Sequence, residues 1–179
     1  MMKKLIALLL VMVIGVSLVA CGEKADADKV ETPEIVNLTG TMEETINAIN
    51  EKHAAMELPL MVMSLDLADV ENFGYYTCFT STDDFVDAAY CEPMMGQPYS
   101  LVLLRVKEGV DAKTVAQEMY DNMNMRKWVC MEADTKTAAA YGDVAMFFMV
   151  NSDFADQVTT TSMMDAFKTV CGEGVTVIG

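Results

Sequence analysis

His53 is the only histidine in the chain, so any Ser-His-Asp or Cys-His hydrolase mechanism would have to use it as the general base. It falls on the apolar stripe of a predicted helix, near the end where the helix dipole favours a cation. We therefore interpret it as a structural residue. The sequence contains no Gly-x-Ser-x-Gly, Ser-x-x-Lys, His-Glu-x-x-His or Walker-type segment. We predict no catalytic residue.

Four cysteines could form disulfides or bind a metal: Cys78, Cys91, Cys130 and Cys171. None belongs to a Cys-x-x-Cys pair, which argues against a zinc ribbon and against a thioredoxin-like site. If these cysteines lie outside the membrane, one or two disulfides could form. If the surroundings hold little oxidant, the cysteines would instead stay as buried free thiols, and the sequence favours neither alternative. The spacing indicates no pairing.

Methionine is abundant, with 17 residues in the chain. Met61 and Met63 would share one face of a strand, and Met119 and Met123 one face of a helix. Thioethers bind copper(I), but methionine at regular spacing is more typical of flexible core filling. We therefore predict no metal site and no cofactor.

Acidic and tyrosine side chains are the remaining candidates for a site. The carboxylates cluster in two places, at Asp66, Asp69 and Glu71 and at Asp83, Asp84 and Asp87. They lack the loop spacing of an EF-hand, so we expect solvated faces. The tyrosines that could line a groove for a sugar or a peptide are Tyr75, Tyr76, Tyr90 and Tyr99. Half-buried tyrosines of a sheet are the ordinary alternative.

Cys21 is the residue for which the sequence predicts a definite chemistry. Lys3 and Lys4 precede a charge-free apolar run that ends near Ala20, which is too short for a membrane-spanning helix and suits a signal peptide. Leu18-Val19-Ala20-Cys21 resembles a bacterial lipobox, in which the thiol is alkylated by a diacylglyceryl group before cleavage. We expect residues 1–20 to be a signal peptide and Cys21 to be lipidated, which would anchor the protein at the extracytoplasmic face of the membrane.

The charge excludes one class of partner. The formal net charge is −15, and it becomes −17 once Lys3 and Lys4 leave with the signal peptide. Phosphate backbones demand basic residues, so we expect no nucleic-acid partner. The charged segment 21–40 has no apolar period and is predicted to be a tether. Residues 41–179 are long enough for a single domain with a substantial core.

The pattern of apolar residues predicts how this domain folds. Thr41 and Glu44 have capping-box spacing before a helix at 42–53, and 60–65 is strand-like. Phe73-Gly74-Tyr75-Tyr76 indicates a turn or a short helix. Two ββα units are expected to follow, with Asp111 and Asp153 as helix caps. Their predicted strands are 85–91, 100–107, 135–141 and 144–150, and Trp128 is expected to be buried. This pattern indicates an α+β domain with helices packed on an antiparallel sheet.

Several of these segments resemble a family of proteins known as domain of unknown function 4358, which are largely lipoproteins of Gram-positive anaerobes. The resemblance covers roughly 41–172. It rests on the capped helix at 42–53, Pro59-Leu60-Met61, Glu92-Pro93-Met94-Met95-Gly96, 100–107, the Trp128 region and Tyr141-Gly142-Asp143-Val144. It implies the fold and the location, and it implies no activity because the family has none assigned.

Taken together, the sequence favours a non-enzymatic binding module held at the cell envelope by Cys21, with an envelope protein or ligand as partner. A carboxylate-dependent envelope hydrolase, with an acid such as Asp84 or Glu92, is the second hypothesis. An accessory subunit of a membrane complex is the third, and it would require an exposed apolar patch.

Overall fold

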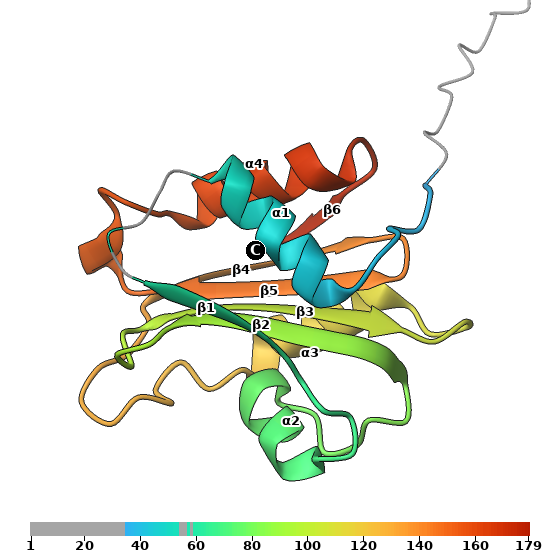
Figure 1. Ribbon diagram of the computed structural model, residues 1–179, viewed down its shortest axis with the longest axis horizontal. Coiled ribbons are helices and arrows are strands. Elements are labelled where there is room, and N and C mark those ends of the chain that lie inside the picture. Colours follow the sequence, from blue (N-terminus) through green and yellow to red (C-terminus); the bar gives the residue numbers. More distant parts are fainter. Residues whose placement is uncertain (1–34, 54–56, 58) are drawn as a thin grey trace, which may run out of the picture. The chain divides into compact units, whose positions relative to one another are not determined.

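A six-stranded antiparallel sheet, in the order β1-β2-β3-β5-β4-β6, forms the centre of the computed structural model (Figure 1). The structure describes residues 35–53, 57 and 59–179, so the predicted signal peptide, Cys21 and most of the predicted tether lie outside it. The strands are β1 (Leu60–Ser64), β2 (Phe85–Pro93), β3 (Tyr99–Val106), β4 (Thr135–Tyr141), β5 (Val144–Val150) and β6 (Thr176–Ile178).

Two pairs of helices cover the two faces of this sheet (Figure 1). α1 (Met42–Lys52) and α4 (Thr160–Cys171) pack on one face, and α2 (Val70–Thr77) and α3 (Ala112–Asn122) pack on the other. A short 3-10 helix, η1 (Ser152–Phe154), lies between β5 and α4. The predicted α+β architecture, an αβ unit followed by two ββα units, is confirmed.

β3 and β5 are the two central strands of the sheet, and helices cover both of their faces. Every residue of β5 is buried, and in β3 only Arg105 is partly exposed. Strands covered on both faces appear in a sequence as continuous apolar runs rather than as an alternation. This is the pattern that predicted both strands, and Leu103 pairs with Met146 where they meet.

The short connections follow from residues that favour special backbone geometry. Gly142 has a φ of +55° and begins the two-residue turn between β4 and β5, a conformation that glycine adopts without strain. Thr41 and Glu44 form the predicted capping box of α1. Asp153 was expected to cap the last helix, and this was wrong. Asn151 caps η1, and Thr159 caps α4 because its hydroxyl accepts from the backbone of Ser162.

Two elements were not predicted with definite bounds. α2 was expected only as a turn or a short helix, and β6 was not expected at all. Within the described part of the chain, no helix is both long and apolar enough to cross a membrane.

Candidate functional site

A buried lysine, Lys127, lies in a box of three aromatic rings on the face of the sheet that α2 and α3 cover. Its Nζ is 4.7 Å from the centroid of the Tyr76 ring. It is 5.3 Å from the centroids of Tyr75 and of Trp128. Ammonium groups are attracted to the faces of such rings at these distances. Only 1% of the Lys127 side chain is exposed, so the attraction acts largely away from water.

Two polar groups from the sheet complete the box. Glu92 in β2 forms an ion pair with Lys127, and Ser100 in β3 lies 3.1 Å from the Lys127 ammonium. Burial lowers the pKa of Lys127, and the Glu92 carboxylate opposes that shift. Tyr90 also extends the box, because its ring stacks on Tyr76 with centroids 3.8 Å apart. The box therefore joins α2, β2, β3 and the α3–β4 connection.

The pKa values of the tyrosines in the box indicate a structural role rather than a role in proton transfer. Desolvation is the first cause that raises the pKa of Tyr75, and the Glu92 charge adds to it. The pKa of Tyr76 is raised much further, by desolvation, by a hydrogen bond with Tyr90 and by nearby charges. Both phenols stay protonated near neutral pH. A general base that operates there needs a pKa close to the working pH, which neither tyrosine has.

Large apolar side chains are exposed around this box, and we call the group the apolar surface. It consists of Met61, Met63, Tyr75, Met94, Met95, Val129 and Met131. Val129 is fully exposed and Met95 is 76% exposed. Tyr75, Gly96, Lys127, Val129 and Met131 are among the residues that line a hollow of about 340 Å³. The β2–β3 and α3–β4 connections therefore meet beside Lys127.

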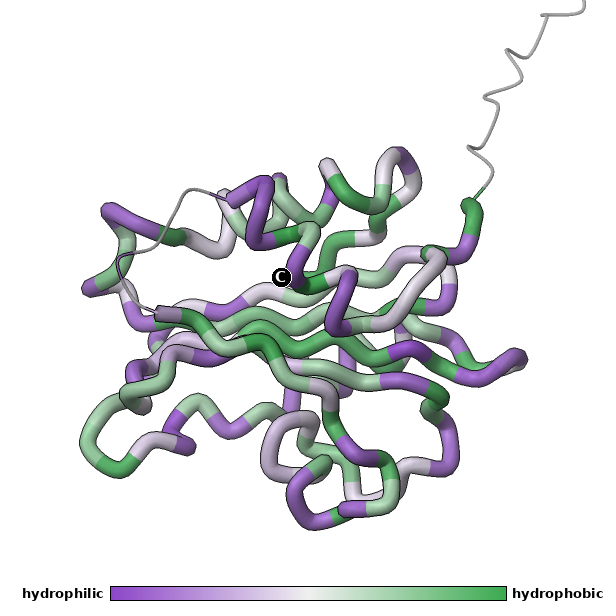
Figure 2. The backbone as a smooth tube through the Cα atoms, viewed as in Figure 1, coloured by the Kyte–Doolittle hydropathy of each residue, from purple (hydrophilic) through white to green (hydrophobic). Residues whose placement is uncertain are grey.

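Register connects β1 to the same surface. Met61 pairs with Glu92 and Met63 pairs with Tyr90, so both methionines are on the face of the sheet that carries the box. The Tyr90 hydroxyl lies 3.3 Å from the Met63 sulfur. Figure 2 shows hydrophobic colour along β1 and along part of the connection between α3 and β4. The surface thus extends from an edge strand to the loop that the box holds.

The sequence predictions for site residues have mixed outcomes. Tyr75, Tyr76 and Tyr90 come together as described, whereas Tyr99 lies in the core on the opposite face. His53 lies at the end of α1, where its Nε2 is 3.1 Å from the Ser162 hydroxyl. Trp128 is buried as predicted, at 9% exposure. Met119 and Met123 are both buried in the core, as expected for core filling, whereas Met61 and Met63 are exposed and do not fill the core.

The carboxylate clusters are used locally or face the solvent. Asp69 caps α2, and Asp87 accepts a hydrogen bond of 2.7 Å from the backbone of Met42. Asp83 and Asp84 are exposed. No group of three or more His, Cys, Asp or Glu side chains that could hold a metal ion occurs among residues 35–53, 57 and 59–179. The described acids of the two clusters therefore do not converge on a common metal site.

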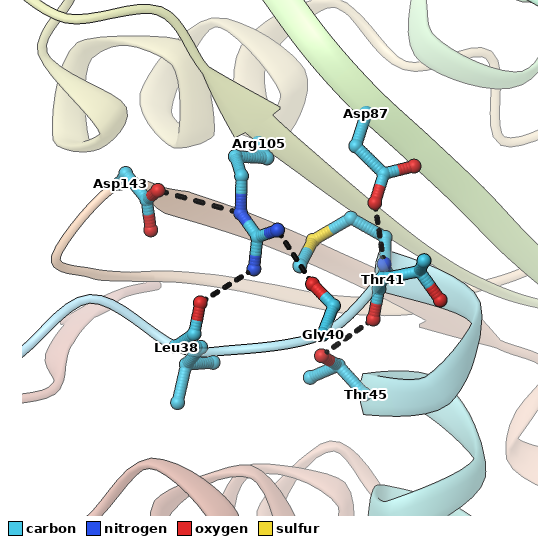
Figure 3. A network of polar contacts seen from close by, with 8 residues as sticks. Leu38, Gly40, Thr41, Thr45, Asp87, Arg105 and Asp143 are labelled. Carbon is cyan, nitrogen blue, oxygen red and sulfur yellow. Dashed lines mark hydrogen bonds and ion pairs between the residues drawn. The ribbon is translucent and has the colours of Figure 1, made fainter.

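A second polar network fastens the segment before α1 to the sheet (Figure 3). The Arg105 guanidinium donates to the carbonyl of Leu38 at 2.8 Å and to that of Gly40 at 2.6 Å. Its Nε is 3.3 Å from the Asp143 carboxylate. Residues that the sequence analysis placed at the end of the tether are thus held against β3 and the β4–β5 turn. This network lies apart from the box and positions the start of α1.

The four cysteines are free thiols in the structure: Cys78, Cys91, Cys130 and Cys171. Burial raises the pKa of Cys91 to about 11 and that of Cys171 to about 12. Burial also raises the pKa of Cys78 to about 11, with a contribution from Glu118. Cys130, in contrast, is exposed on the loop next to Val129.

We expect iodoacetamide to alkylate Cys130 first in the native protein, because the other three thiols are protonated and covered. For the partly exposed Cys78, the rate should keep rising, by about tenfold per pH unit, up to pH near 11, since only the thiolate reacts. An ordinary thiol levels off about two units earlier. Mass spectrometry of timed digests measures each site, and denatured protein is the control. Equal labelling of all four in the native state would contradict the described burial.

Comparisons with family models, with curated proteins and with solved structures find no match to this chain. The resemblance to the domain of unknown function 4358 family therefore stays a prediction, and function has to be inferred from the residues themselves.

Proposed function

We propose that the chain is a lipid-anchored protein of the bacterial cell envelope whose domain binds a protein partner through the apolar surface. The observation that carries this proposal is a set of seven exposed large apolar side chains in neighbouring segments. Three of them line one hollow, two lie on the edge strand β1, and Met94 and Met95 directly precede Gly96, which also lines the hollow. Exposed apolar residues that are scattered singly need no explanation, but a contiguous group marks an interaction site. Methionines and an aromatic ring are also the residue types that interfaces favour.

The buried box supports the proposal because it makes the exposed loop ready to bind. Val129 directly follows Lys127 and Trp128 in the chain, and Met131 comes two residues later. The box fixes these two residues through contacts with α2, β2 and β3. A loop that is already ordered loses less conformational freedom on binding, which favours affinity. Glu92 compensates the Lys127 charge inside the protein, and the solvent-facing side of the loop presents the apolar side chains of Val129 and Met131.

No observation favours the hydrolase hypothesis. A carboxylate that acts as general acid near neutral pH needs a raised pKa. The two described carboxyl groups with a shifted pKa, Asp111 and Asp134, are shifted downward. Hydrogen bonds from Thr114 and from Ser152 are the first causes.

The anchor is tested by replacing Cys21 with Ala. We expect the variant to lose incorporation of labelled fatty acid and to leave the membrane pellet, because the acyl chains are the predicted attachment. Fractionation and blotting, with and without a salt wash, measure this. Cys130→Ala is the matched control and should stay in the pellet. A Cys21→Ala variant that remains in the membrane after the salt wash would show that residues 5–19 are a true anchor instead.

The binding surface is tested by photo-crosslinking in living cells. A benzophenone amino acid at Val129 should give a discrete adduct, because this side chain is fully exposed next to the hollow. The same amino acid at Thr161, exposed on α4 across the sheet, is the control. The adduct should disappear when Met131 is also changed to Ser. Identical adducts from Val129 and Thr161, or none from either, would contradict the proposed surface.

A further inference from the structure

We infer that the segment recognised by the apolar surface is a cationic amphipathic helix of the partner. This inference rests on the function proposed above and specifies the chemistry of the partner. It follows from the charges that border the surface, from the side chains that compose it and from the size of its hollow.

Two acidic groups adjoin the apolar surface at Tyr75. Tyr75 lines the hollow that also contains Val129 and Met131. The same ring lines an adjoining depression together with Asp69 and Glu71. Neither of these acids takes part in the three ion pairs found in the described part of the chain. A ligand seated on Tyr75 therefore meets apolar side chains on one side and two uncompensated carboxylates on the other.

The cations near the surface are already neutralised. Lys127 pairs with Glu92 inside the box, and Arg126 pairs with Glu132 on the same loop. Both pairs lie next to residues that line the hollow or its neighbour. Because the positive charges are compensated and the acids are not, the local field favours a positive ligand. The net charge of −15 acts in the same direction at longer range.

The composition of the surface favours a helix as the form of this ligand. Methionine is unbranched and polarizable, so a methionine-rich surface can adapt to the side chains of an apolar helix face. A helix presents apolar anchors at spacings of three and four residues, and lysine or arginine on its flanks would face the acids. The hollow of about 340 Å³ can take anchor side chains of such a helix, although not the whole helix.

The test uses the full chain, held by its anchor in lipid nanodiscs, and a fluorescein-labelled synthetic peptide of leucine and lysine at helical spacing. We expect saturable binding by anisotropy that weakens as salt is added. Val129→Ser with Met131→Ser should weaken binding by about tenfold or more, because two apolar contacts are lost. Val177→Ser, exposed on β6 at the far edge of the sheet, should leave binding unchanged.

The acidic border is tested separately. Asp69→Asn with Glu71→Gln should slow association and flatten the salt dependence, and Asn keeps the cap of α2. Asp165→Asn with Glu173→Gln, both exposed on or just after α4, removes the same number of charges as a control and should change neither. Equal binding of a peptide with glutamate in place of lysine would overturn the inference. Equal signal from empty nanodiscs would also overturn it, since the peptide would then be bound by lipid.

The failure of this inference can be told apart from the failure of the proposed function. If the Val129 crosslink forms in cells but the cationic peptide does not bind, the surface has a partner of another chemistry. If neither is observed, the surface itself is not a binding site.

Discussion

Replacing Leu103 with Asp is expected to unfold the domain or to lower its free energy of unfolding by several kcal/mol. Leu103 is fully buried in β3, where Ala89 and Met146 flank it in register and both are also fully buried. A carboxylate at this position would lie among apolar side chains under α1 and α4, with no partner. An isolated buried charge costs far more than the typical stability of a small domain can offset.

Chemical denaturation followed by circular dichroism measures the effect of Leu103→Asp. Val86→Asp is the matched control, because it adds the same charge on β2 at a side chain that is half exposed. That variant should change stability by no more than about 0.5 kcal/mol. A Leu103→Asp protein with the stability of the control would mean that β3 is not at the centre of the sheet.

The central strands could be predicted from sequence because burial on both faces leaves a strong local signal. The apolar run is continuous in β5 and spans Leu101 to Leu104 in β3, and its short length favours a buried strand over a helix. α2 lacked such a signal: it has only eight residues, and Gly74 interrupts it. β6 has three residues and exists through its pairing with β4, some 36 residues earlier in the chain. Such a pairing leaves no local pattern.

The choice of face for each helix could not be predicted for the same reason. Because β3 and β5 are apolar on both sides, either face would accept either helix. The structure places α3 on one face and α4 on the other, although each follows a similar pair of strands. The two ββα units thus have the same order of elements, but their helices pack on opposite faces of the sheet.

The candidate site was predictable only in part. Four tyrosines were expected either to line a groove or to be half-buried in the sheet, and three of them, Tyr75, Tyr76 and Tyr90, meet. Tyr99 separates from them because it pairs with Val150 and packs on Phe148 under the other pair of helices. Lys127 and Glu92 are 35 residues apart and follow no spacing rule. Their ion pair depends on where the α3–β4 connection returns to the sheet.

Replacing Lys127 with Ala is expected to destabilise the domain by roughly 3–5 kcal/mol, because removal of one partner leaves a poorly solvated charge behind. Glu92 would lose the one ion-pair partner it has among the described residues, while its side chain stays 16% exposed. The double variant Lys127→Met with Glu92→Gln carries no charge at the site and should recover most of the loss. Thermal and denaturant unfolding of the single and double variants measure the coupling between the two groups.

The pH dependence of a third variant, Glu92→Gln, separates the ion pair from simple packing. In the native protein, burial lowers the pKa of Lys127 and Glu92 opposes the shift, so the variant should lower the pKa further. The unfolded chain would then bind more protons than the folded one between that pKa and the ordinary value of 10.5, and stability should rise with pH across this window. We expect the deficit of Glu92→Gln relative to wild type to shrink as the pH rises. A deficit that stays constant with pH would mean that Glu92 acts through packing alone, and that the Lys127 charge is not what holds the Val129 loop against the sheet.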